Sequence, residues 1–179
     1  MRNIPGTIQD ASTGIRPSTR DEIDRWLLKY PADQKRSALL IALRLVQEDN
    51  GGWLSTELMD AVAEYLELPK AAVYEVATFY KMYDLKPVGR HKIAVCHSIS
   101  CLLNGSEKIL AHLEHRLGIK PGETTADGLF TLKAVECLAA CVCAPAMQID
   151  DRCYHENLTP EKVDAILDTM KKAESEDGK

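Results

Sequence analysis

The sequence predicts an α+β protein in which a helical bundle is followed by a small α/β domain. The first half of the chain repeats apolar residues at helical spacing, whereas short β-type runs alternate with helices after the Pro-Val-Gly segment at 87–89. The 179 residues, 45% hydrophobic and 27% charged, suffice for two small lobes. We therefore divide the chain into a flexible N-terminal arm at 1–20, a helical bundle domain at 21–86, an α/β domain at 87–172 and a disordered tail at 173–179.

Four helices are expected in the first half. The first is short and spans residues 21–30, and the second ends near Gly51 and Gly52. Ser55 is placed to cap the third helix, because a serine hydroxyl accepts a hydrogen bond from an amide of the first turn. Pro69 opens the fourth helix, where proline is favoured. The apolar side chains expected on the inner face of that helix are Ala72, Val76, Phe79 and Tyr83.

Strands and helices alternate in the second half. The predicted elements, in chain order, are a strand at 91–95, a helix at 106–117, a strand at 129–135, two short strands at 146–149 and 152–155, and a helix that begins at 159–160. The order β-α-β-β-β-α matches a thioredoxin-like core, in which a crossover joins a parallel pair and a hairpin and a closing helix follow. A ferredoxin-like fold would need a helix between the third and fourth strands.

Charge and composition exclude several classes of protein. A net charge of −5 with no basic block argues against a nucleic-acid partner. The longest strongly apolar run, residues 38–43, is far shorter than the roughly 20 residues that cross a bilayer, so no membrane insertion is expected. No apolar export segment follows Met1, so we expect a cytoplasmic location with reduced cysteines.

Four of the six cysteines follow the two predicted parallel strands. Cys96 and Cys101 come after the first strand, and Cys137 and Cys141 come after the second. Because a right-handed crossover brings the loops after both strands to one edge of the sheet, the four thiols are expected to converge there. Four converging thiolates predict a zinc or iron–sulfur site, and the C-x4-C and C-x3-C spacings leave the metal open. No C-x-x-C motif is present, which disfavours a thiol–disulfide enzyme.

The other two cysteines and a nearby histidine are not expected to bind the metal. Cys153 is predicted to be a small buried packing residue. Cys143 lies two residues after Cys141 and is the alternative to it as a ligand. His97 lies between two proposed ligands, but a Rieske centre uses two histidines and only one is nearby.

The cysteine spacing and several shorter motifs together resemble a known family. The pattern C-x4-C, 35 intervening residues and C-x3-C is preceded by Gly-Trp at 52–53, Val-Ala-Thr-Phe-Tyr at 76–80 and Pro-Val-Gly-Arg-His at 87–91. Over about residues 21–172 the chain is similar to the small thioredoxin-like 2Fe-2S subunit of the respiratory NADH:quinone oxidoreductase (complex I). That family has a helical N-terminal lobe and a thioredoxin-like ferredoxin lobe.

The resemblance implies one 2Fe-2S cluster and electron transfer, with no catalytic residue in this chain. Cys96 and Cys101 would bind one iron, and Cys137 and Cys141 the other, with Cys141 rather than Cys143 filling the C-x3-C register. Relatives of the same shape serve NAD-linked hydrogenases and formate dehydrogenases, so the holoenzyme stays open. A zinc-stabilised interaction module and a soluble thiol oxidoreductase remain the alternatives from other classes.

The resemblance also implies partners. These are a flavin-binding subunit that holds FMN and oxidises NADH, and other peripheral-arm subunits of a complex on the cytoplasmic side of the inner (plasma) membrane. This chain has no G-x-G-x-x-G fingerprint, so NADH is expected to bind the partner and not this chain. Residues 21–85 are expected to form much of the interface, with the arm at 1–20 ordering on assembly.

Overall fold

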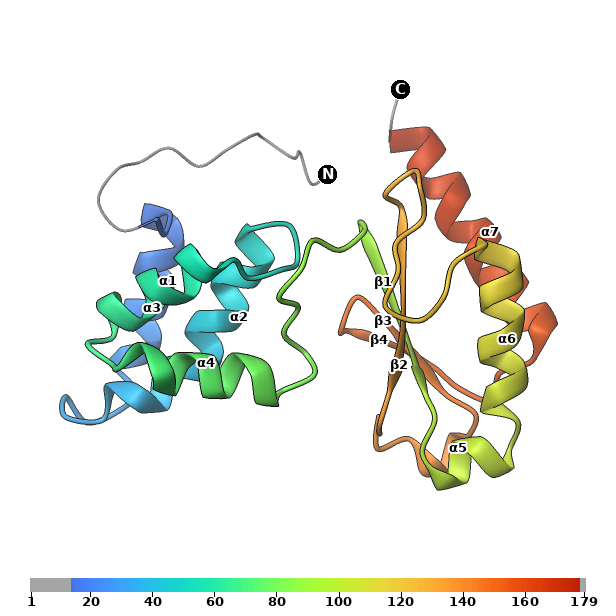
Figure 1. The fold of residues 1–179 in the computed structure, drawn as a ribbon, viewed down its shortest axis with the longest axis horizontal. Helices are drawn as coiled ribbons and strands as arrows, with labels where there is room; N and C mark the ends of the chain where they lie inside the picture. The colour runs from blue at the N-terminus through green and yellow to red at the C-terminus, as the bar shows by residue number, and fades with distance from the viewer. Residues whose placement is uncertain (1–13, 178–179) are drawn as a thin grey trace. The chain divides into compact units, whose positions relative to one another are not determined.

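The computed structural model describes residues 14–177, which form two compact units (Figure 1). We call residues 14–87 the helical unit and residues 88–177 the sheet unit. The predicted fold class, a helical bundle followed by a thioredoxin-like α/β domain, is confirmed. Residues 1–13 of the predicted arm and 178–179 of the predicted tail lie outside the described residues. None of the described helices is long and apolar enough to cross a membrane.

The described part of the helical unit contains four α-helices around one core. They are α1 (Pro17–Leu27), α2 (Leu39–Asp49), α3 (Thr56–Tyr65) and α4 (Lys70–Phe79), with the 3-10 turn η1 (Lys35–Ala38) before α2. Ser55 caps α3 as predicted, since its hydroxyl accepts a hydrogen bond from the Leu58 amide at 3.2 Å. The fully buried core includes Ile23, Leu39, Leu43, Leu54, Val62, Leu66 and Val73.

The start of α1 corrects the predicted arm and the predicted first helix. The arm was expected to extend to residue 20 and the helix to span 21–30, but α1 begins at Pro17 and ends at Leu27. Proline suits the first helical position because its fixed φ is helical and its absent N–H would have no partner there. The buried Thr19 fastens this first turn to α2, since its hydroxyl donates to the Asp49 carboxylate at 2.9 Å.

The inner face of α4 also differs from the prediction. The helix buries Val73 and Ala77, whereas the predicted core residue Phe79 is 75% exposed. Tyr83 is buried as predicted, but it lies beyond the end of the helix, where its hydroxyl donates to the Leu40 carbonyl oxygen at 2.7 Å. Because the helix ends at Phe79, the helical period cannot be extended to Tyr83, and a spacing of four residues fits positions 73 and 77 equally well.

The sheet unit is built on four strands in the order β2-β1-β3-β4. The strands are β1 (His91–Cys96), β2 (Phe130–Val135), β3 (Met147–Ile149) and β4 (Cys153–His155). β1 and β2 are parallel, whereas β3 runs antiparallel to both β1 and β4. Helix α6 (Ser106–Leu117) connects β1 to β2 and, together with α7 (Pro160–Asp177), covers one face of the sheet (Figure 1). Side chains from the sheet and both helices form the second core.

Helix α7 corrects the predicted disordered tail at 173–179, because the helix continues to Asp177. Residues 173–177 contain an alanine and two glutamates, which favour helix, and they continue directly from the preceding turns. Glu174 fastens the end of the helix to the start of β1, because it forms an ion pair with Arg90 and its carboxylate lies 3.3 Å from His91 Nε2.

Gly89, in the Pro-Val-Gly segment, is required by the close approach of two backbones. A Cβ at this position would lie 3.0 Å from both the Gly128 carbonyl oxygen and the Phe130 carbonyl carbon. Its amide donates to Thr131 Oγ1 at 2.6 Å. This contact holds the chain against the start of β2 as it enters β1, and so sets the parallel register of the two strands.

Candidate metal centre

The two strands that precede the cysteine pairs end side by side. Cys96, the last residue of β1, is paired with Val135, the last residue of β2. The amide of His97 donates to the Val135 carbonyl oxygen at 3.0 Å, which continues this alignment past the strand. The segments that follow the two strands therefore start from one edge of the sheet, and both carry thiols. In Figure 1 this edge is the lower end of the sheet unit, where α5 lies.

A short helix, α5 (Ile99–Leu103), carries Cys101 and was not predicted. Its backbone is closed by the Leu102 amide, which donates to the Ser98 carbonyl oxygen at 2.8 Å. The helix turns Cys101 inward, to 2% exposure, and leaves Leu103 at 81% exposure. The apolar residues of α5 are at helical spacing, but five residues are too few for periodicity to distinguish a helix from a loop.

Cys96 and Cys101 are packed together in a small buried cluster. They are 3% and 2% exposed and contact Ala146, which is fully buried just before β3. Three partly buried side chains from the second cysteine loop pack against this cluster: Leu138, Ala140 and Ala144. The two cysteine loops therefore share one packed apolar cluster, and most of its members other than the cysteines are alanines.

The Cys101 thiol also connects the first pair to Cys141. Burial raises the pKa of the Cys101 thiol, and the neighbouring Cys96 and Cys141 thiols raise it further, whereas a backbone hydrogen bond at Ala146 acts in the opposite direction. Cys141 opens the 3-10 turn η2 (Cys141–Cys143) and is exposed. Thiols that are protonated without metal must lose their protons when a metal binds them.

Cys137, like Cys141, lies at the surface. It is exposed, and its Sγ accepts a hydrogen bond from the Ala139 amide at 3.3 Å. Ala139 itself has φ +57°, a left-handed conformation that is unusual for alanine. On the other side, Cys96 Sγ lies 3.9 Å from the carbonyl oxygen of Glu136, the residue before Cys137. Cys137 is thus positioned directly beside the end of β1.

The donor set fits a 2Fe-2S cluster. Each iron of such a cluster takes two protein ligands and shares two bridging sulfides, so two separated pairs of thiolates suffice. Among residues 14–177, no three His, Cys, Asp or Glu side chains converge as the ligands of a single ion would. Each of the two loops supplies two thiols, which is the number of protein ligands that one iron of the cluster needs. Thiolate sulfur is also the ligand type that iron–sulfur clusters select.

The remaining cysteines behave differently from each other. Cys143 is half-buried, and a hydrogen bond with Glu156, followed by burial, raises the pKa of its thiol. The prediction that Cys153 is a buried packing residue is wrong, because its side chain is exposed. The residue lies on β4, which is an edge strand and so has a neighbour on one side only. His97 is exposed, and its Nε2 lies 3.7 Å from the Glu136 carboxylate.

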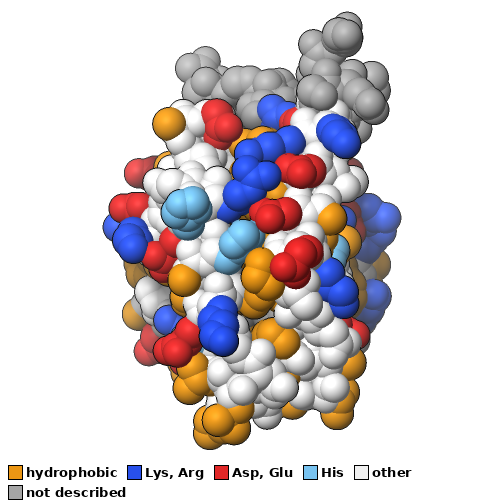
Figure 2. Space-filling view, turned by 90° about the vertical axis from the view of Figure 1, so that its right-hand side faces the viewer, with side chains coloured by type: hydrophobic (Ala, Val, Ile, Leu, Met, Phe, Trp, Pro, Cys, Tyr) orange, Lys and Arg blue, Asp and Glu red, His pale blue; other side chains and the backbone are white. Residues whose placement is uncertain are grey.

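Exposed apolar side chains surround this edge of the sheet. Four of them, which we call the apolar rim, come from α5 and η2 and have exposed fractions of 74%, 42%, 81% and 95%: Ile99, Leu102, Leu103 and Val142. Figure 2 shows orange side chains gathered at the lower end of the molecule, whereas charged side chains cover the middle of the same face. The edge that carries the thiols is therefore also an apolar surface.

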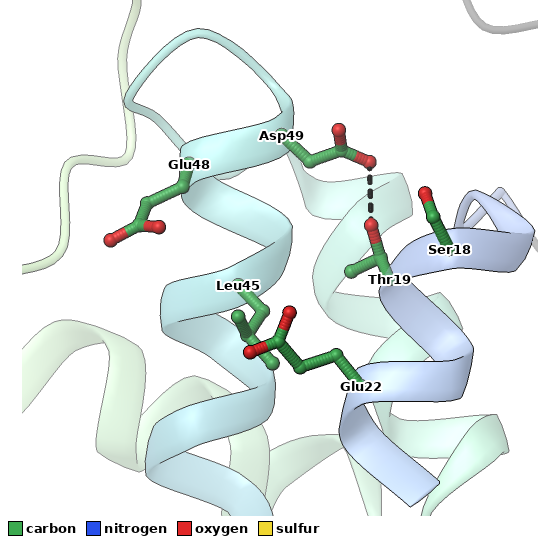
Figure 3. A pocket seen from close by; sticks show the side chains of 6 residues that line it. All are labelled: Ser18, Thr19, Glu22, Leu45, Glu48 and Asp49. Atoms are coloured by element: carbon green, nitrogen blue, oxygen red, sulfur yellow. Dashed lines mark hydrogen bonds between the residues drawn. The ribbon is translucent and has the colours of Figure 1, made fainter. Parts of the chain in front are cut away.

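A hollow in the helical unit is a weaker candidate for a site. It lies between α1 and α2 and is lined by Ser18, Thr19, Glu22, Leu45, Glu48 and Asp49 (Figure 3). One of its three acidic residues, Asp49, is already bound, since one carboxylate oxygen accepts from Arg16 at 2.7 Å and the other from Thr19 at 2.9 Å. We therefore attribute this hollow to the packing of α1 against α2 and not to a binding site.

Comparison with known proteins identifies the family of this chain. The model of the family described as thioredoxin-like [2Fe-2S] ferredoxin matches residues 23–171. The E-type subunit of the NADH-quinone oxidoreductase of Rickettsia bellii (strain RML369-C) is 50% identical over 143 residues, which are 80% of this chain and 85% of that protein. An E-type subunit of the NADH-quinone oxidoreductase of Rhizobium meliloti (strain 1021), numbered 2, is 44% identical over 155 residues, which are 87% and 90% of the two chains.

Solved structures share the fold. The crystal structure of an NAD+-reducing [NiFe]-hydrogenase in the air-oxidized state superposes with a TM-score of 0.63 at 23% identity. The similarity covers 75% of this chain and 23% of the hydrogenase chain. At this level of identity, the likeness concerns the fold alone.

Proposed function

Because the chain belongs to the thioredoxin-like [2Fe-2S] ferredoxin family, we propose that it is the 2Fe-2S electron-transfer subunit of an NADH:quinone oxidoreductase (complex I). The observation that carries this proposal is the parallel pairing of β1 and β2, which brings two cysteine-bearing loops to one edge of the sheet. Cys96 and Cys101 would hold one iron, and Cys137 and Cys141 the other. Isolated, the chain is an electron carrier, and it acts as an enzyme only as a subunit of the complex.

The bound cluster supplies a site that takes up or releases one electron. The residues of this chain fix its position, limit its contact with water and set its potential. The two buried cysteines would hold one side of the cluster among alanine side chains, and the exposed pair would leave the other side near the surface. The amide of Ala139 donates to Cys137 Sγ, and hydrogen bonds to cluster sulfurs stabilise the added negative charge and so raise the reduction potential.

In this proposal the partner subunit, and not this chain, takes the hydride from NADH. The partner is a flavin-binding subunit that binds NADH and FMN, and it exchanges electrons with the cluster of this chain. The sequence contains no G-x-G-x-x-G fingerprint for a dinucleotide. The complex would place this chain on the cytoplasmic side of the plasma membrane, peripheral to it, and residues 21–85 would contribute much of the contact with the partner.

An anaerobic absorption spectrum tests the cluster. The purified chain should be brown, contain two irons and show visible bands that bleach with dithionite. A colourless protein that holds zinc would identify a zinc-stabilised interaction module instead, and metal-free disulfide reductase activity would identify a thiol enzyme.

Titration with NADH tests whether the flavin-binding subunit oxidises NADH and this chain only carries electrons. NADH should not bleach the isolated chain, and it should bleach the chain promptly once the flavin-binding subunit is added. Bleaching of the isolated, flavin-free chain by NADH would make it a dehydrogenase in its own right and would overturn the carrier assignment.

A further inference from the structure

We infer that Lys133 raises the reduction potential of the 2Fe-2S cluster and so helps to set how readily this chain accepts an electron. Lys133 lies on β2, outside both cysteine loops. The inference rests on the proposed function, because it concerns a cluster held by the four proposed thiolates. It adds a residue that does not bind the cluster but acts on its charge.

Strand alternation places Lys133 on the face of the sheet that carries Cys96. The core beneath α6 and α7 takes alternate residues of the two parallel strands, which are Ile93, Val95, Phe130 and Leu132. Because successive side chains of a strand point to opposite faces, Cys96 and Lys133 both lie on the face away from these helices. In the register of the strands, Lys133 is the partner of Ala94, two residues before Cys96.

The buried pair of thiols belongs to the same face. Cys96 packs with Cys101 and Ala146 in a cluster that is separate from the core beneath the helices. Two residues along a strand correspond to about 7 Å, so the residue pair that contains Lys133 lies that far from the one that contains Cys96. The four methylene groups of a lysine can span part of this distance.

Lys133 is also the cationic residue of the sheet that lies nearest the thiols. The lysines of the described strands are Lys92 and Lys133, and these strands contain no arginine. Lys92 lies four residues before Cys96, about 13 Å away along the strand, and it forms an ion pair with Asp151. Neither cysteine loop, at residues 97–105 and 136–146, contains a lysine or an arginine.

The acidic side chain beside the thiols is more exposed than Lys133. Glu136 directly precedes Cys137, but its side chain is 74% exposed and lies 3.7 Å from His97 Nε2. Lys133 is half-buried. Because water and salt screen an exposed charge more strongly than a half-buried one, the lysine is expected to act more strongly on the charge of the cluster.

The sign of the effect follows from the charge of the cluster. A 2Fe-2S cluster held by four thiolates is negative, and more so when it is reduced. A fixed positive charge therefore stabilises the reduced form more than the oxidised form. At a separation of about 10 Å and the effective dielectric constant of a partly exposed site, one unit charge changes the equilibrium constant for reduction by about threefold to tenfold.

Equilibration with a redox dye tests the inference. The full-length, cluster-loaded chain is mixed anaerobically with a viologen dye, reduced stepwise with dithionite, and the visible bands report the reduced fraction. Lys133→Met should lower the equilibrium constant for reduction by about threefold to tenfold, and Lys133→Glu should lower it further. Lys133→Arg keeps the charge and should stay within about twofold of the unchanged chain. The effect of Lys133→Met should shrink as salt is raised.

Lys120→Met is the matched control, because it removes the same charge from the same unit. Its side chain is 74% exposed and lies beyond the end of α6, whereas the start of that helix follows the first cysteine loop. The equilibrium constant for reduction should stay within about twofold. Lys133→Gln repeats the test if Lys133→Met does not retain the cluster.

Three results would overturn the inference. They are an unchanged equilibrium constant in Lys133→Met or Lys133→Gln with the visible bands intact, an equal change in Lys120→Met, which would indicate the net charge alone, or a change in Lys133→Arg as large as in Lys133→Met, which would indicate packing. Failure of the proposed function looks different, because the unchanged chain would then lack the visible bands before any variant is made.

Discussion

The two ends of β1 in the sheet unit are surrounded by different kinds of side chain. At its first residue, His91 Nδ1 lies 2.8 Å from the Asp150 carboxylate and Nε2 lies 3.3 Å from the Glu174 carboxylate. Arg90 is ion-paired with Glu174, and Lys92 with Asp151. At its last residue, Cys96, roughly 17 Å away, the neighbouring groups are thiols, alanines and exposed apolar side chains.

This difference assigns a stabilising role to one end of the strand and metal binding to the other. At the His91 end, charges of both signs neutralise one another and fasten β1, α7 and the β3–β4 turn together. At the Cys96 end, the two loops that follow β1 and β2 carry four thiols, and few charged groups lie beside them. Changes at the two ends should therefore have separable effects, on unfolding at one end and on metal binding at the other.

The largest effect is expected at the thiols. Serine at any one of the proposed ligands Cys96, Cys101, Cys137 and Cys141 should abolish the visible bands or shift them strongly, because an alkoxide is a harder and poorer ligand for this iron. Iron content and absorption spectra of the four anaerobically purified variants measure this.

Cys143→Ser and Cys153→Ser are the matched controls, and both should keep the cluster. Unchanged bands in one of the four variants would remove that residue from the ligand set, and loss of the bands in Cys143→Ser would move the assignment from Cys141 to Cys143.

A smaller effect, on stability alone, is expected at the opposite end. His91→Leu should lower the free energy of unfolding by about 2 kcal/mol, because it leaves the carboxylates of Asp150 and Glu174 without their shared partner. The visible bands should be unchanged. Urea unfolding of the cluster-loaded variant measures the loss.

His112→Leu provides the comparison for His91→Leu. His112 Nε2 lies 3.0 Å from the Asp164 carboxylate, so its removal breaks one carboxylate contact, whereas the removal of His91 breaks two. The loss should therefore be clearly smaller than for His91→Leu. Equal losses of unfolding free energy in the two variants would contradict the prediction that the His91 contacts contribute more to stability than the His112 contact.

The pH dependence of stability tests the role of the charged groups at the His91 end of β1. Burial alone would raise the pKa of Asp150, but the His91 ring and the Lys92 amide together lower the pKa below its ordinary value. A carboxylate whose pKa is lower in the folded state stabilises the fold above the ordinary carboxyl pKa of about 3.9, and this contribution disappears as the pH falls through the folded-state value.

Asp150→Asn tests this dependence, since asparagine tolerates the left-handed φ of +54° at this position. The variant of the metal-free chain should be less stable than the unchanged chain by about 1 kcal/mol at neutral pH. The difference should shrink as the pH falls from about 4 to about 2. A difference that stays constant over this range would contradict the assignment.

The smallest effect is expected in the second cysteine loop. Ala139→Gly should stabilise the chain by about 0.5 to 1 kcal/mol, because glycine adopts φ +57° without the steric cost that alanine bears. Its amide still donates to Cys137, so the bands should persist. Ala140→Gly, at φ −106°, has no such cost to remove and should be neutral or destabilising. Stabilisation by both substitutions would show that the left-handed φ is not the cause.

Local signals in the sequence were sufficient for most elements of the sheet unit. The helix at 106–117 has the predicted bounds, and β1 and β2 differ from their predictions by one residue each, because apolar periodicity and flanking glycines are local features. The predicted convergence of the two cysteine loops follows from the same strands, since a parallel pair sends both loops to one edge. The face of α4 was mispredicted because two apolar stripes fit its sequence equally well.

What the sequence by itself determined is therefore the order of elements, the fold class and the spacing of the thiols, all of which follow from short-range patterns. The tertiary structure decided which thiols are enclosed: Cys96 and Cys101 are buried, whereas Cys137, Cys141 and Cys153 are exposed. It also decided the contacts of His91, which join residues 59 and 83 positions apart. Burial and pairing depend on side-chain contacts between distant segments, which local patterns do not specify even where they place two segments at the same end of a sheet.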